Sequence, residues 1–167
     1  MPLVIGLGLG RNVVPRPLLV AGIVASMLPD LDVLAFRFGI AYSDPLGHRG
    51  FSHSLFFAMI MAAVASLFHR RLGVSRFTAF AFVLIAGASH GLLDMLTNGG
   101  LGVAYFWPLT DERFFFPERV IQVSPIGVYR FFSADGFAAL ESELFWIWLP
   151  ASVALGVLLF LRRRNSR

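Results

Sequence analysis

The chain has 167 residues, of which 57% are hydrophobic and 14% are charged. Its mean hydropathy of +0.73 excludes an ordinary soluble domain, in which about 45–50% of residues are apolar and about 25% are charged. The chain has no cysteine, which excludes disulfides and thiolate metal sites and leaves imidazole and carboxylate as the strong metal ligands.

Four segments are predicted to cross a membrane: residues 17–38, 51–68, 77–97 and 144–161. A helix of 18–21 residues is roughly 27–31 Å long, which matches a hydrocarbon core of about 30 Å. Pro29, Asp30 and Asp32 interrupt the first segment, so we expect a shorter or broken helix there. The predicted fold is an all-α, multi-pass membrane bundle of about four spanning helices, forming one integral membrane domain over residues 1–167.

Two further stretches complete the predicted architecture. Residues 1–10 are apolar but too short to span, and no charged segment precedes them, so we expect insertion through the chain's own helices rather than a cleaved leader. Residues 98–143 are rich in aromatic residues, which favour the membrane interface. We predict that this segment forms an ordered interfacial lid, with a short hairpin around residues 114–123.

The basic residues are all arginine, and nine of them form clusters at residues 11–16, 70–76 and 162–167. In a four-span topology these clusters share one side, which the positive-inside rule makes cytoplasmic together with both termini. All ten acidic residues then lie toward the non-cytoplasmic side. The net charge of +4 is therefore interpreted as a topology signal, and no nucleic-acid partner is expected.

Three motifs place ionisable side chains at the non-cytoplasmic ends of the predicted helices: PDLD at 29–32, HRGFSHS at 48–54 and SHGLLD at 89–94. Motifs that are distant in sequence therefore converge at one membrane level. The candidate metal ligands are Asp30, Asp32, His48, His53, His90 and Asp94.

These candidate ligands can also be interpreted without a metal ion. His90 and Asp94 share a helix face at a spacing of four, and they could form an interhelical hydrogen-bonded pair instead of a metal site. One aspartate could be a helix cap, although two carboxylates two residues apart repel unless a cation lies nearby. An ionisable group inside a membrane helix costs roughly 2.5–3.5 kcal/mol on insertion scales, so six incidental ones would be expensive. Their convergence favours a metal site.

Two further residues are candidates for catalysis. Arg49 lies beside the histidines, and a guanidinium matches phosphate oxygens in a bidentate manner. Glu143 is predicted to open the last spanning helix as a metal ligand or catalytic base, although the helix dipole alone favours an acid there.

Ser52 is a plausible N-cap of the second span. Arg113 and Arg130 are weaker candidates that could anchor lipid headgroups.

The order LPDLD, HRGFSHS, SHGLLDMLT and an aromatic stretch with WP and FFP resembles the YdjM-like family of bacterial membrane-bound metal-dependent hydrolases. The resemblance covers nearly the whole chain. It implies metal-binding roles for the six candidate ligands and a further candidate in Glu143. It also implies a divalent metal, zinc above all, and a place in the bacterial inner membrane. The chain departs from the family pattern because no Thr-His pair precedes its first apolar stretch.

The motif layout is also similar to the zinc-dependent phospholipase C and P1 nuclease group, which implies hydrolysis of a phosphoester by metal-activated water. A site at the membrane face indicates an amphiphilic substrate, a membrane lipid or lipid-linked phosphate. The alternative is a metal-ion transporter or a metal-binding membrane protein without hydrolytic activity. Transporters often have internal repeats and midplane sites, neither of which is visible in this sequence.

Overall fold

The computed structural model describes residues 1–165 and is helical, with no strand in that range. The helices are α1 (Pro2–Leu9), α2 (Arg16–Met27), α3 (Leu55–Leu67), α4 (His69–Leu72), α5 (Arg76–Asp94), α6 (Val128–Phe131), α7 (Ala134–Glu143) and α8 (Leu149–Asn165). Two 3₁₀ segments, η1 (Leu28–Phe38) and η2 (Phe51–His53), and a π-helical segment, η3 (Leu144–Trp148), complete the described elements. The all-α class is confirmed.

The first predicted span is continuous rather than broken. α2 begins after Pro15, with a proline in its first turn where no backbone N–H is needed, and it runs directly into η1. Pro29 cannot donate the next helical hydrogen bond, and the helix tightens into 3₁₀ geometry instead of stopping. Gly39, in the left-handed conformation at φ 77°, ends it. The two aspartates of this segment therefore lie on a helix.

Three helices in the described part of the chain are long and apolar enough to cross a membrane: Arg16–Phe38, Arg76–Asp94 and Ala134–Arg164. The fourth predicted span is not confirmed, because α3 has only 13 residues, roughly 20 Å of helix. It begins late because Ser54, rather than Ser52, is its N-cap and accepts a hydrogen bond from the Phe57 N–H. The residues before this cap, Phe51–His53, form the separate 3₁₀ segment η2 instead of the first turn of α3.

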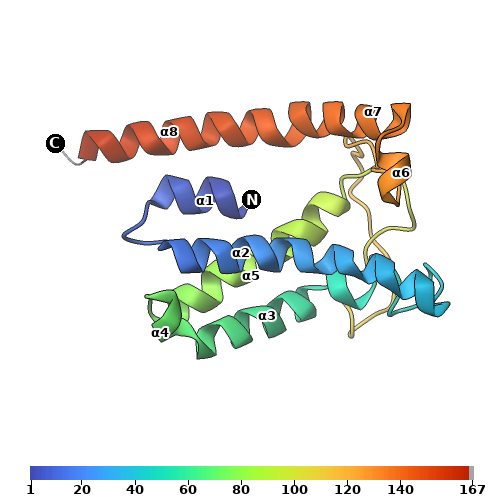
Figure 1. Ribbon diagram of the computed structural model, residues 1–167, viewed down its shortest axis with the longest axis horizontal. Helices are drawn as coiled ribbons and strands as arrows, with labels where there is room; N and C mark the ends of the chain where they lie inside the picture. Colours follow the sequence, from blue (N-terminus) through green and yellow to red (C-terminus); the bar gives the residue numbers. More distant parts are fainter. Residues whose placement is uncertain (166–167) are drawn as a thin grey trace.

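The core lies among α2, α3 and α5, where Leu18, Ala62 and Val83 are buried. Phe82 packs over Gly22, where a Cβ would come within 2.4 Å of the ring. α1 packs against α2 and α8, and Figure 1 shows the long α7–η3–α8 helix along one side of this bundle. Only 6% of the most apolar stretch of that last helix is buried, as expected for a helix that faces lipid.

The aromatic segment divides into two parts. Residues 134–143 belong to α7, so the last helix begins well before the predicted residue 144. Residues 98–127 contain no helix, and the hairpin predicted around residues 114–123 does not form. Phe114 pairs with Val103, whereas Ile121 pairs with Thr97, so the two ends of that stretch bond to different partners. Val103 and Tyr105 are buried beside Met95, which holds this segment against the end of α5.

Candidate metal centre

Two groups of ligand-type side chains meet at one end of the bundle, and they share His53. The first, which we call the primary cluster, consists of Asp30, His53, His90 and Asp94. The second, which we call the Asp32 cluster, consists of Asp32, His48 and His53. Within each cluster the ligand atoms lie within 4.8 Å of one another. The six residues predicted from sequence are thus brought together in space.

The local structure explains how these residues are presented. Asp30 and Asp32 are two apart on η1, where a turn has about three residues, so they point in different directions. His90 and Asp94 are one turn apart on α5 and point the same way. Gly91 allows the close approach of η2, because a Cβ there would lie 2.5 Å from the His53 carbonyl oxygen.

The distances between ligand atoms in the primary cluster are those expected when the atoms surround a single metal position. His53 Nε2 lies 3.1 Å from His90 Nε2 and 3.2 Å from Asp94 Oδ2. Asp30 Oδ1 lies 3.4 Å from His90 Nε2 and 3.6 Å from His53 Nε2. Ligands bound at 2.0–2.1 Å to a tetrahedral ion are separated by about 3.3 Å. The donor set therefore fits a small divalent cation such as zinc.

The Asp94 carboxylate supports the same fit. Its Oδ2 is buried and makes no hydrogen bond with the described residues, although Arg49 Nε lies 3.2 Å away as an ion pair. A buried carboxylate oxygen without a hydrogen bond is costly, and coordination of a cation would satisfy it.

Both carboxylate oxygens of Asp32 have partners within the protein. Its Oδ2 accepts hydrogen bonds from the Ser52 hydroxyl at 2.5 Å and from the Arg49 backbone N–H at 3.1 Å. Its Oδ1 lies 2.5 Å from His48 Nδ1, and its Oδ2 lies 3.1 Å from His53 Nδ1. Ser52, predicted as a helix cap, therefore has a different role, because its hydroxyl bonds to this carboxylate.

His53 lies in η2, before α3, and is surrounded by carboxylates. Burial alone lowers the pKa of an imidazole, but the neighbouring carboxylates of Asp30, Asp32 and Asp94 outweigh burial and raise the pKa of His53 to about 10. The surroundings of this ring therefore strongly favour positive charge. A divalent cation beside Nε2 would satisfy the same carboxylates in place of a proton.

Arg49 is buried, and both its backbone N–H and its carbonyl form hydrogen bonds. Its φ of 61° is unusual for a residue other than glycine. Its N–H donates to Asp32, and its carbonyl accepts from the Ala104 N–H at 2.9 Å. Its Nη1 donates to Thr97 Oγ1 at 2.8 Å and to the Gly99 carbonyl at 3.1 Å. Arg49 thus links the two clusters, because its backbone N–H donates to Asp32 and its guanidinium forms an ion pair with Asp94.

Arg113 fixes the loop that carries His48. Its guanidinium donates to the carbonyls of His48 and Tyr42 at 2.9 Å each and of Asp44 at 3.1 Å, and it lies over the Tyr42 ring. Burial lowers the pKa of Arg113, and the Tyr42 hydroxyl opposes that shift. The sequence indicated a weaker candidate for binding an anionic substrate oxygen, with lipid-headgroup anchoring as the alternative. The arginine instead binds backbone carbonyls, whose positions no motif reveals.

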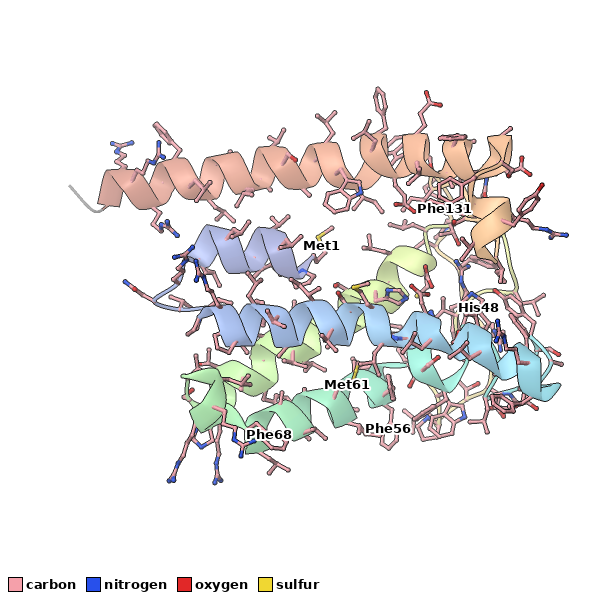
Figure 2. All side chains as sticks on the ribbon, viewed as in Figure 1. Met1, His48, Phe56, Met61, Phe68 and Phe131 are labelled. Atoms are coloured by element: carbon pink, nitrogen blue, oxygen red, sulfur yellow. The ribbon has the colours of Figure 1, made fainter. Side chains whose placement is uncertain are left out.

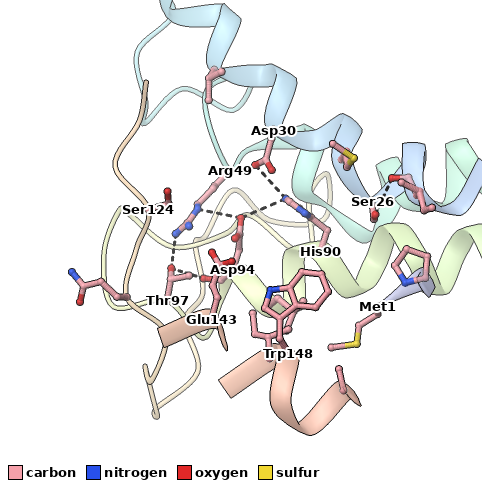
Figure 3. A pocket seen from close by; sticks show the side chains of 18 of the residues that line it. Met1, Ser26, Asp30, Arg49, His90, Asp94, Thr97, Ser124, Glu143 and Trp148 are labelled. Carbon is pink, nitrogen blue, oxygen red and sulfur yellow. Dashed lines mark hydrogen bonds and ion pairs between the residues drawn. The ribbon is translucent and has the colours of Figure 1, made fainter. Parts of the chain in front are cut away.

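A pocket of about 650 Å³ opens beside the primary cluster. Figure 3 shows Asp30, His90, Asp94 and Arg49 on one side of it and Trp148 on the other. Apolar residues from α1, α2, η3 and α8 continue the wall: Leu3, Val4, Ile23, Met27, Ile147 and Ala151. The pocket is therefore polar at the ligand end and apolar along the helices.

Glu143 lines this pocket and faces the primary cluster (Figure 3). It interacts electrostatically with Asp94 and Asp30. The prediction that it opens the last helix is wrong, because that helix begins at Ala134 and Glu143 lies more than two turns inside it. The dipole of a helix N-terminus therefore does not explain its presence.

Comparison with known proteins identifies the family of the chain. Residues 1–165 match the sequence profile of the family described as YdjM inner membrane protein. The chain is 46% identical over 166 residues to the inner membrane protein YbcI of Escherichia coli (strain K12), which covers 98% of this chain and 95% of that protein. The chain belongs to the YdjM family. No solved structure matches it.

Membership of the YdjM family makes the chain an integral inner membrane protein, as predicted. In this family member the described arginines of the three clusters lie at the end of the molecule opposite the ligands, while Arg167 lies outside the described residues. α4 and the outer end of α8 lie at one end in Figure 1, and η1 and α7 lie at the other. Figure 2 likewise shows His48 far from Phe68, which immediately precedes α4. The described cluster arginines and the candidate ligands are thus separated along the length of the molecule.

Proposed function

We propose that this YdjM family member is a membrane-bound, metal-dependent hydrolase of a phosphoester in an amphiphilic substrate. The observation that carries the proposal is the pocket beside the primary cluster, which combines ligand side chains, an arginine and a carboxylate with an apolar wall. A site that only passes an ion needs no cavity of about 650 Å³ for an organic molecule.

We assign the ion to Asp30, His53, His90 and Asp94. Asp32 is assigned to orient His53, because a carboxylate at Nδ1 leaves Nε2 free to face a metal, the usual arrangement behind a histidine ligand. His48 supports Asp32 in turn. A divalent ion held in this way supplies Lewis acidity and a bound water of lowered pKa.

The other pocket residues perform the remaining steps. Glu143 accepts the proton of the attacking water and returns it to the leaving oxygen, as expected of a carboxylate that faces the ligands. Three N–H groups of Arg49 contact Asp94, Thr97 and Gly99, whereas Nη2 has no acceptor among the described residues. We assign Nη2 to a phosphoryl oxygen. The apolar wall binds the hydrocarbon part of the substrate.

The proposed orientation places the arginine clusters and both termini in the cytoplasm and the metal ligands at the non-cytoplasmic face. The support is the separation of nine arginines from the acidic residues.

The test compares hydrolysis with ion transport in purified protein. Zinc-loaded and chelator-treated samples are assayed against panels of phospholipids and phosphodiesters, and zinc flux is measured in vesicles containing the same protein. Turnover that requires the metal, without flux, supports the hydrolase. Metal-dependent flux without turnover would favour the transporter alternative.

A further inference from the structure

A second cavity lies at the opposite end of the molecule and is independent of the metal centre. Its volume is about 650 Å³, and it is bounded by α1, the turn at residues 10–15, the start of α2 and the last turns of α8. Figure 1 shows the end of α1, the start of α2 and the outer part of α8 at the same end of the bundle. Nothing in the proposed hydrolysis uses this cavity.

Three arginines from three different elements line the cavity: Arg11, Arg16 and Arg162. None of the ten acidic residues lines it. Among the described residues, the side chains of Arg11 and Arg16 have no hydrogen-bond or ion-pair partner. The cavity therefore concentrates positive charge that the described part of the chain does not neutralise.

The third arginine is held in place by the backbone. Arg162 Nη1 donates to the Leu7 carbonyl at 3.3 Å and lies over Gly10. Gly10 has a φ of 82°, and a Cβ at this position would lie 2.1 Å from Arg162 Nη1. The positive φ favours glycine at this position, and a larger residue would also displace the Arg162 guanidinium. This contact ties the end of α8 to the end of α1.

The remaining lining is mostly aliphatic and comes from α1, the turn that follows it, α2 and α8: Leu7, Leu9, Val14, Leu19, Leu155 and Leu159. A cavity with several guanidinium groups at its rim and an aliphatic wall between membrane helices matches a phosphate joined to a hydrocarbon chain. Inorganic phosphate would match only the rim.

We propose that this cavity binds an anionic phospholipid, with its phosphate on Arg11, Arg16 and Arg162 and an acyl chain between α1 and α8. The general preference of arginine for one side of a membrane does not account for the cavity. Arg70, Arg71 and Arg76 belong to the same charge pattern but do not line it. They therefore provide a matched control with an equal change in charge.

The experiment measures lipid binding by native mass spectrometry of the full chain, delipidated in detergent, with phosphatidylglycerol or phosphatidylcholine added. The wild type is compared with a variant carrying Arg11→Gln, Arg16→Gln and Arg162→Gln, and with one carrying Arg70→Gln, Arg71→Gln and Arg76→Gln. We expect phosphatidylglycerol to bind the first variant about a hundredfold more weakly, since each arginine contributes roughly a fivefold factor. The control variant should bind as the wild type does.

Equal weakening in both variants would overturn the proposal, because it would indicate a general charge effect. Equal binding of phosphatidylcholine would do the same. In a thermal-shift measurement, inorganic phosphate that raises the Tm as much as phosphatidylglycerol does would also contradict a lipid site. If the triple variant does not fold, Arg162→Gln alone and Leu159→Trp, which fills the aliphatic part, should each weaken lipid binding in a folded protein.

Discussion

His53 Nδ1 lies 3.1 Å from Asp32 Oδ2, while Nε2 of the same ring faces His90, Asp30 and Asp94. One imidazole therefore joins the two clusters, with a carboxylate behind it and the candidate metal position in front. Replacing a residue whose atoms face the candidate metal position should therefore have a different effect from replacing the carboxylate behind His53.

The first prediction concerns metal content. Purified protein should contain roughly one zinc ion per chain, and His90→Ala should remove it, because a tetrahedral site loses one of its four ligands. Elemental analysis in detergent measures the ratio. His69→Ala is the control, since His69 lies in α4 at the other end of the bundle. Absence of metal from both wild type and variant would refute the metal centre.

A second prediction separates ligands from orienting residues. Asp30→Asn should abolish metal binding, whereas Asp32→Asn should weaken it by about 10–100-fold, because a carboxylate behind a histidine ligand tunes affinity without providing a bond. Competition with a zinc-binding dye measures both affinities. Two ions per wild-type chain, with one lost in Asp32→Asn, would instead make the Asp32 cluster a metal site of its own.

Glu143→Gln should leave the metal content unchanged and lower kcat by about 10²–10⁴-fold, as expected when a general base is removed from a hydrolytic site. The measurement pairs elemental analysis with turnover of a substrate found in the panel above. Glu141→Gln is the control, because Glu141 does not line the pocket beside the primary cluster. Loss of zinc in Glu143→Gln would show that Glu143 is a ligand.

Arg113→Gln should destabilise the protein rather than alter chemistry directly. The substitution removes hydrogen bonds to the carbonyls of His48, Tyr42 and Asp44, so we expect the free energy of unfolding to fall by about 1.5–3 kcal/mol. Denaturant unfolding in detergent measures the change. Arg119→Gln is the matched control, since Arg119 is exposed and, among the described residues, its side chain makes no hydrogen bond or ion pair and lies over the Phe115 ring. Equal losses in the two variants would contradict this role.

The final prediction tests orientation. The chain has no cysteine, so a single introduced cysteine reports its own location. Asn12→Cys should react with an impermeant thiol reagent only from the cytoplasmic side, and Glu112→Cys only from the opposite side. Labelling in intact cells and in inverted vesicles distinguishes them. Reaction of both positions from one side would overturn the proposed topology.

Much of this architecture could be predicted from local patterns. The apolar windows, the separation of arginines from acids and the three ligand motifs each depend on residues close together in sequence, and they predicted a membrane protein with six ligands at one end. The extent of α3 was not predictable in this way. Hydropathy does not show that Ser54 caps the helix while His53 and Ser52 turn toward η1.

The partners of those ligands required tertiary structure. Asp30 and Asp32 look equivalent in sequence, yet the 3₁₀ turn directs one toward His90 and the other toward His48. Arg113 and Arg162 bind backbone carbonyls distant in sequence, which no side-chain motif encodes. Sequence alone thus determined which chemical groups gather at each end of the bundle. The fold decided which atoms face one another, because those contacts depend on how separate helices pack.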